Sequence, residues 1–197
     1  KENKLRASVL AAPAFTRRNT KDNTPSVLSV SMVPGSKVSV DVAAKGGGSE
    51  AKSKFKMMNP SDSIVDWVLE MLPQMGAGWC PPGMLGIGIG GTAEHCVKLA
   101  KQSLMDPIDM GQLKERGPRN DIEEMRIEIF DKVNALGIGA QGLGGLSTIL
   151  DVKILDWPCH AANKPVAMIP NCAATRHAHF TLDGSGPSYL EKPNLAE

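Results

Sequence analysis

The sequence predicts a mixed α/β (α+β) fold: a mixed sheet with packed helices and glycine-rich active-site loops. Segments with apolar residues at helical spacing are interleaved with short apolar or alternating runs bounded by Gly and Pro. The 197 residues, 42% apolar and 22% charged, suffice for a buried core. The chain has 20 Gly and 14 Pro but only 4% aromatic residues, which indicates tight turns and close backbone approaches. We expect a single domain over residues 1–197.

The first half of the chain predicts a hairpin and a helix. Apolar residues at 27–33 and alternating valines at 38–42 flank a Pro-Gly turn, which is typical of two paired strands. A glycine loop follows at 44–50. Ser61 is then expected to cap a helix with an apolar stripe over 64–72, which Pro73 and Gly76 should end.

The second half predicts two helices and four strands. A buried strand at 84–90 should turn into a helix capped by Thr92 and running to about Met105. Asn120 and Glu123 resemble a capping box, and the helix that they start should end at Gly137. The remaining strands are expected at 148–155, 166–169 and 176–182.

Bulk composition argues against several classes of protein. The net charge of +1 gives no reason to expect a nucleic-acid or anionic-membrane partner. No apolar run approaches the roughly 20 residues of a membrane span, and no signal peptide is recognised. Four cysteines without a CxxC pair indicate reduced thiols and a cytoplasmic protein. Because the sequence starts at Lys1 rather than Met, we expect a fragment.

Two cysteines lie in bends rather than on helix or strand faces. Cys80 is followed by Pro81-Pro82-Gly83, and Cys172 follows Asn171. A thiol held in such a loop is a candidate metal ligand or reactive group. By contrast, Cys96 is expected in the core and Cys159 in a structural role.

Three other patterns have both a structural and a functional interpretation. Gly86, Gly88 and Gly91 satisfy G-x-G-x-x-G, so the alternative functions include a nucleotide- or anion-binding module at residues 86–91, while close helix packing explains the same glycines. His177 and His179 share a strand face and could bind zinc or be hydrogen-bonded. Gly46, Gly47 and Gly48, flanked by Lys45 and Lys52, favour an anion site over a flexible linker.

Taken in order, eight segments resemble the iron–sulfur-dependent (class I) fumarate hydratases, a family that includes L-tartrate dehydratase. They are Leu5-Arg6, Asp22-Asn23-Thr24-Pro25, Ala44-Lys45-Gly46-Gly47-Gly48-Ser49, Gly78-Trp79-Cys80-Pro81-Pro82, Gly90-Gly91-Thr92-Ala93-Glu94, Gly137-Ile138-Gly139-Ala140-Gln141-Gly142, His160-Ala161-Ala162 and Pro170-Asn171-Cys172-Ala173-Ala174-Thr175-Arg176.

The resemblance implies a [4Fe–4S] cluster held by three cysteines, with one iron left open as a Lewis acid for substrate. Cys80 and Cys172 match two of these ligands. The third is expected upstream of Lys1, so the isolated piece is expected to be cluster-free and inactive. Cys96 and Cys159 match no ligand position of the family.

The same resemblance implies the activity and the partners. The family would reversibly dehydrate (S)-malate to fumarate, with L-tartrate or a related dicarboxylate as the alternative substrate. Arg6 and the main chain of Gly46, Gly47 and Gly48 would bind the small dicarboxylate, and His160 would be the catalytic histidine. The chain would correspond to most of the N-terminal domain, without its first part. It would act with a C-terminal catalytic domain or β subunit, which holds the catalytic threonine, and is expected to form a homodimer.

Overall fold

The computed structural model describes residues 6–185 and 187–189 of the chain. They form two compact units, one that ends at Lys37 and one that begins at Val38. The first unit contains a short antiparallel ladder of β1 (Leu10–Ala11) and β2 (Arg18–Asn19). In the described part of the chain, no helix has the length and apolar character required to cross a membrane.

A four-stranded mixed sheet forms the centre of the second unit. Its order is β4 (Lys54–Met58), β7 (Lys164–Cys172), β5 (Gly83–Gly90) and β6 (Ile149–Trp157). β5 and β6 are parallel, whereas β7 is antiparallel to both of its neighbours. With helices packed on this sheet, the predicted mixed α/β fold class is confirmed.

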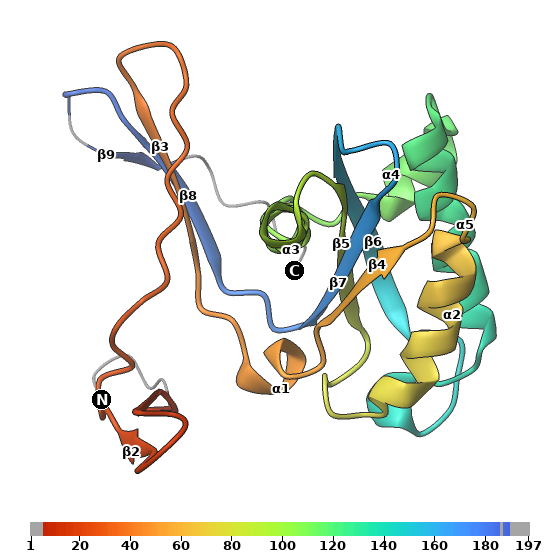
Figure 1. Ribbon diagram of the computed structural model, residues 1–197, viewed down its shortest axis with the longest axis horizontal. Helices are drawn as coiled ribbons and strands as arrows, with labels where there is room; N and C mark the ends of the chain where they lie inside the picture. The colour runs from red at the N-terminus through yellow and green to blue at the C-terminus, as the bar shows by residue number, and fades with distance from the viewer. Residues whose placement is uncertain (1–5, 186, 190–197) are drawn as a thin grey trace. The chain divides into compact units, whose positions relative to one another are not determined.

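Helices cover both faces of the sheet (Figure 1). One face is covered by α3 (Ala93–Ser103), whose Cys96, Ala100 and the following Leu104 contribute to the smaller apolar core. On the other face, α2 (Ile64–Met75) and α5 (Asp121–Ala135) enclose the larger core. Three shorter helical segments complete the unit: α1 (Gly47–Glu50), α4 (Met110–Arg116) and the 3₁₀ turn η1 (Ala140–Gly142).

Glycines on β5 allow α3 to approach the sheet closely. A Cβ atom at Gly88 would lie 2.0 Å from the carbonyl oxygen of Cys96, and one at Gly86 would lie 2.3 Å from that of Ala100. Since real Cβ atoms do not approach backbone oxygens so closely, only glycine fits at these positions. The packing interpretation of the glycine pattern is confirmed, and these two glycines need no nucleotide to explain them.

The predicted N-terminal hairpin is wrong. Residues 27–33 form no strand, and β3 (Val38–Ala43) instead pairs with β8 (His177–Leu182), far along the chain. A third strand, β9 (Pro187–Tyr189), extends this second sheet. The register explains why β3 pairs with β8, because residue pairs such as Val40 with Phe180 place apolar residues of both strands on the same face of the sheet.

The predicted strands after residue 83 and the three predicted helices are present, with small corrections. Thr92 is the N-cap residue of α3, although its side chain makes no capping hydrogen bond. Ser63 rather than Ser61 caps α2, because the Ser63 hydroxyl accepts a hydrogen bond from the backbone of Asp66 at 3.1 Å. Pro73 lies within the last turns of α2, and Gly76 ends the helix. At the start of α5, Asn120 caps the helix as expected. The sequence analysis missed the strands β1, β2, β4 and β9 and the short helical segments α1, α4 and η1.

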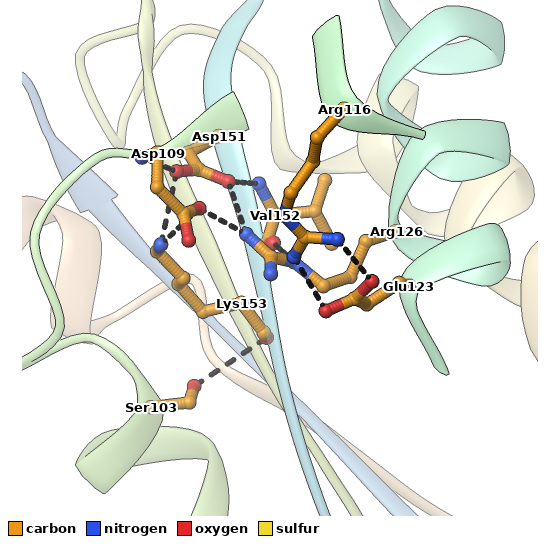
Figure 2. A network of polar contacts seen from close by, with 8 residues as sticks. All are labelled: Ser103, Asp109, Arg116, Glu123, Arg126, Asp151, Val152 and Lys153. Atoms are coloured by element: carbon orange, nitrogen blue, oxygen red, sulfur yellow. Dashed lines mark hydrogen bonds and ion pairs between the residues drawn. The ribbon is translucent and has the colours of Figure 1, made fainter. Parts of the chain in front are cut away.

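A buried ionic network attaches the edge strand β6 to the helices beside it (Figure 2). Asp151 is fully buried and pairs with Arg126 at 3.2 Å and with Lys153 at 3.2 Å. Arg126 also donates to the carbonyl of Val152 at 2.6 Å, so α5 satisfies a backbone oxygen of the strand. Asp109, which caps α4, accepts from Lys153 at 2.6 Å and pairs with Arg126. The charges are therefore matched within the network.

Candidate functional site

The two loop cysteines lie on neighbouring segments at one end of the central sheet. Cys80 precedes β5 by three residues, in a bend as predicted. The predicted loop position of Cys172 is wrong, because β7 continues to Cys172 as its last residue and leaves the side chain only partly exposed. These strands are antiparallel, and their register pairs Gly83 directly with Cys172. The start of β5 and the end of β7 therefore bring the Cys80 loop and Cys172 together, although 91 residues separate the two thiols in the sequence.

The Cys80 loop combines a buried anchor with an exposed thiol. Trp79 is 1% exposed and belongs to the larger core, whereas Cys80 itself is exposed. The backbone of Cys80 has φ 59°, a left-handed conformation that is uncommon for residues other than glycine and frequent at functional sites. The core side chain thus fixes a loop that presents the sulfur outward.

The glycine turn predicted as an anion site packs against this loop. A Cβ atom at Gly48 would lie 2.6 Å from the carbonyl oxygen of Gly78, so a side chain there would displace one of the two segments. The stem of Lys52 lies across Gly78 on another side, since its Cε would be 2.7 Å from a Cβ at that position. Gly48, the last of the three glycines, is therefore in direct contact with the backbone of the Cys80 loop.

Lys45 brings a partly buried positive charge to the same end of the sheet. Its side chain is only 12% exposed, and its Nζ atom lies 3.2 Å from a carboxylate oxygen of Glu50. Burial lowers the pKa of the Lys45 ammonium group, while Glu50 and, more weakly, the Cys172 sulfur act in the opposite direction. Lys45 directly precedes Gly46, so this charge lies beside the glycine turn.

A further loop holds the segment after Cys80 in place. Both the backbone nitrogen and the side-chain amide of Gln141 donate to the carbonyl oxygen of Pro81, at 2.7 and 3.2 Å. Gly142 lies against Ala77, whose Cβ would be 3.2 Å from one placed on the glycine. The glycine-rich stretch at 137–145 therefore contacts the Cys80 segment through Gln141 and Gly142 and restrains its backbone.

The residues present match part of the ligand set that an iron–sulfur cluster requires. Cys80 and Cys172 are free thiols on adjoining segments. The neighbouring Asn171 is 2% exposed, and its side-chain nitrogen has no hydrogen-bond partner in the described chain, so a donor is left for a bound group. Within residues 6–185 and 187–189, no group of three or more His, Cys, Asp or Glu side chains is placed to hold a metal ion. The described residues therefore provide two of the cysteine ligands that such a cluster requires, rather than the full set of three.

His160 lies at the opposite end of the sheet from the two cysteines. It lines an open cavity of about 750 Å³ with Trp157 and with residues 91–95 at the start of α3. Gly90, the last residue of β5, pairs with Trp157 there, whereas the Cys80 loop precedes the first residue of the strand. The eight residues of β5 separate these ends by roughly 23 Å. One copy of the chain does not bring His160 to the cysteines.

Arg6 belongs to the first unit, where its backbone is fixed by an asparagine. The side chain of Asn23 donates to the carbonyl of Arg6 at 3.0 Å and accepts from the backbone nitrogen of Ser8 at 2.8 Å. Asn19 adds a third bond to this segment, to the carbonyl of Ala7 at 2.9 Å. The Arg6 side chain is exposed.

The candidate zinc histidines form part of a polar sheet face. His179 Nδ1 lies 2.6 Å from Asp41 across the β3–β8 pair. Burial, followed by the neighbouring His179, lowers the pKa of His177, which favours its neutral form. Since the described residues offer no three-ligand group at this face, the hydrogen-bonding interpretation agrees better with the structure.

Two features of the site were not predicted. The sequence analysis treated Lys45 only as a charge flanking the glycines, and it assigned no role to Gln141. Their common signal is their place in or beside glycine-rich motifs, where Lys45 bonds the side chains of Ser49 and Glu50 and Gln141 bonds the backbone of Pro81.

Comparison with known proteins identifies the family of the chain. The family model described as "Fumarate hydratase (Fumerase)" matches residues 1–181. A protein of Methanocaldococcus jannaschii named "Putative L(+)-tartrate dehydratase subunit alpha" is 45% identical over 137 residues, which are 68% of this chain and 46% of that protein. The "L(+)-tartrate dehydratase subunit alpha" of Escherichia coli K12 is 28% identical over 177 residues, covering 85% of this chain and 57% of its own length.

The chain thus spans about half the length of the curated relatives that it matches. The family match covers nearly all of the chain, including both loop cysteines and the glycine turn. On this basis the chain belongs to the fumarate hydratase (Fumerase) family.

Proposed function

We propose that this chain is the cluster-binding part of a hydro-lyase that interconverts (S)-malate and fumarate. The observation that carries the proposal is the pairing of Gly83 with Cys172, which brings two sequence-distant cysteines and the glycine turn to one end of the sheet. Membership of the fumarate hydratase family supports the reaction class. Both units of the chain would belong to the N-terminal domain of the complete enzyme.

Cys80 and Cys172 would supply two thiolates to a [4Fe–4S] cluster, and a third cysteine would come from outside the described residues. When bound, such a cluster supplies an iron that acts as a Lewis acid toward the hydroxyl and one carboxylate of a 2-hydroxy diacid. The Trp79 anchor and the two Gln141 hydrogen bonds would keep Cys80 in place whether or not metal is present.

The substrate carboxylates would be bound by backbone and guanidinium groups. Residues 46–48 expose main-chain amides without intervening side chains, which suits close approach of a carboxylate. Arg6 would provide a two-pronged contact to a carboxylate, held at its backbone by Asn23. Such positioning lowers the barrier to removing a proton from the carbon adjacent to the one that bears the hydroxyl, which leaves as water.

His160 is proposed as a catalytic histidine that acts at the site of a second copy. Because β5 separates it from the cysteines of its own chain, a role near the substrate requires the homodimer that we also propose. Its Nδ1 atom accepts a hydrogen bond from the backbone of Ala162 at 3.2 Å, which leaves Nε2 as the nitrogen directed to the reaction.

L-tartrate is the second candidate substrate. Two relatives carry names of L(+)-tartrate dehydratase alpha subunits, and tartrate is a diacid with the same 2-hydroxy group. The word "subunit" in these names also supports a separate β subunit, or a C-terminal domain, as the partner that completes the enzyme. The four free thiols agree with a cytoplasmic location, which we propose on this ground.

The proposal is tested by anaerobic reconstitution of the full-length protein with its companion subunit or domain. We expect iron and sulfide in a ratio near that of a [4Fe–4S] cluster, broad absorption near about 400 nm, and hydration of fumarate. Cys80→Ser and Cys172→Ser should each abolish the cluster, whereas Cys159→Ser, another exposed cysteine, should retain it.

Unchanged iron content in Cys80→Ser and Cys172→Ser would overturn the ligand assignment. Parallel assays with (S)-malate and L-tartrate decide between the two substrates by the ratio of their kcat/KM values.

A further inference from the structure

The glycine turn at residues 46–48 owes its shape to the side chains that flank it. Lys45 Nζ donates to the Ser49 hydroxyl at 2.8 Å, and this hydroxyl donates to the carbonyl of Gly46 at 3.0 Å. Lys45 Nζ also lies 3.2 Å from the carboxylate of Glu50. These bonds link the residues on either side of the three glycines. We call the set of Lys45, Ser49 and Glu50 the Lys45–Glu50 clasp.

The clasp is connected to the helical scaffold through one carboxylate. Glu50 pairs with Lys45 and, through the same oxygen, with Lys101 of α3. Burial opposes ionisation of Glu50, but the hydrogen bond from Lys101 and the two positive charges outweigh it, so the pKa of the carboxyl is lowered and the group stays charged at neutral pH. Without this charge, two ammonium groups would face each other unscreened.

The clasp and the Cys80 loop hold the turn from two sides. Ser49 is 3% exposed, so the inner part of the clasp is packed as tightly as a core residue. On another side, Gly48 abuts the carbonyl of Gly78. Three successive glycines would otherwise sample many backbone conformations, and these contacts select one of them together with the α1 hydrogen bonds from the backbone of Glu50 to Gly46 and of Ala51 to Gly47.

We propose that Glu50 is a positioning residue: by drawing Lys45 and Lys101 together, it fixes the amides of residues 46–48 in the geometry that binds a substrate carboxylate. The inference deepens the proposed function and rests on it for the identity of the ligand as a dicarboxylate. Glu50 itself need not touch substrate, because its effect passes through the turn.

The test compares Glu50→Gln with Glu128→Gln in the full-length, cluster-loaded enzyme. Glu128 forms an ion pair of similar exposure with Lys132 at 2.6 Å on α5, so it is a matched control remote from the turn. Hydrogen exchange of a peptide spanning residues 44–52, measured without substrate, reports the order of the turn. Steady-state kinetics, which give KM and kcat for the diacid, report how well the turn binds the substrate.

We expect exchange in this peptide to accelerate about tenfold in Glu50→Gln, with other peptides unchanged. KM should rise about tenfold or more while kcat changes less than about threefold, because positioning for binding is lost and the reacting groups remain. Glu50→Asp, which keeps the charge, should recover part of both effects. The control should match the wild type in both measurements.

Exchange at residues 44–52 equal to that of the control would overturn the inference, as would faster exchange with an unchanged KM. If Glu50→Gln does not fold, Lys101→Met, which leaves the Lys45–Glu50 pair intact, must loosen the turn for the inference to stand. A wild-type enzyme inactive on every diacid would contradict the proposed function instead, and the exchange comparison would still decide whether Glu50 orders the turn.

Discussion

At the scale of single residues, the same thiol group has different chemistry in different surroundings. Cys96 is fully buried on α3 and donates to the carbonyl of Gly88 at 3.0 Å, and burial raises its pKa to about 11. Cys80 and Cys159 are exposed. The expectation that Cys96 is a core residue is therefore confirmed.

Selective alkylation should separate these cysteines. In the folded, metal-free protein at pH 8, iodoacetamide should modify Cys80 and Cys159 but not Cys96, whose thiolate fraction is roughly 0.1% at that pH. Mass spectrometry of peptides gives the extent at each site. In denaturant all four cysteines should react, and modification of native Cys96 at the rate of Cys159 would contradict the prediction.

The raised pKa of Cys96 also has a consequence for stability. Folding favours the protonated thiol, so its contribution is fully present below pH 9.0, the ordinary value, and is lost as the pH rises through about 11. Replacement by Ala should remove this alkaline dependence from the unfolding free energy.

At the scale of elements, the approach of α3 to β5 depends on backbone contact rather than side-chain packing. Gly88→Ala should destabilise the fold by about 3 kcal/mol, because the new methyl group would overlap the carbonyl of Cys96 and a backbone cannot move aside as a side chain can.

Gly111→Ala is the matched control for this substitution. Gly111 lies in α4 with no atom near its added Cβ, so alanine there should stabilise the protein by about 0.5 kcal/mol. Urea denaturation measures both variants. Equal free energies of unfolding in the two variants would show that the close approach of α3 to β5 does not require glycine at position 88.

The ionic network around Asp151 fixes the edge strand β6 to α4 and α5 (Figure 2). Asp151→Asn should cost about 3–5 kcal/mol, because it leaves the buried cations Arg126 and Lys153 with one fewer counter-charge. Asp131→Asn breaks an exposed pair with Lys114 and should change the unfolding free energy by less than about 1 kcal/mol. Chemical denaturation of both variants provides the comparison, and equal losses would contradict this account of the network.

At the scale of the whole molecule, the sheet separates two groups of family motifs. Cys80, Cys172 and the glycine turn lie at one end of β5, and His160 lies beyond the other. If both groups serve one reaction, the active sites of a dimer must be shared between copies.

Mixed dimers of the full-length protein test this arrangement. Copies with Cys172→Ser and copies with His160→Asn, each inactive alone, should together form dimers with about half of the wild-type activity, since one complete site is restored. Mixing Cys172→Ser with Cys80→Ser should restore none, because both residues belong to one site of one copy. Inactive dimers in the first mixture would contradict the shared site.

Local sequence was sufficient for elements whose partners are close in the chain. The apolar stripe and the Asn120 cap predict α5 within a few residues, because helix formation depends on side chains three or four positions apart. The continuous apolar run at 84–90 predicts β5 for a similar reason. The exposed bend at Cys80 is also predicted from its Gly and Pro residues, whereas Cys172 lies at the end of β7 rather than in the predicted bend.

The sequence by itself determined the fold class, the family resemblance and the residue types of the site. Only the tertiary structure decided that β3 pairs with β8, that the two cysteine loops adjoin, and that His160 lies apart from them. The physical reason is that strand pairing joins residues far apart in the chain, and the choice of partner depends on which faces both strands must bury. The register of β5 and β7 thus brings Cys172 beside the Cys80 loop.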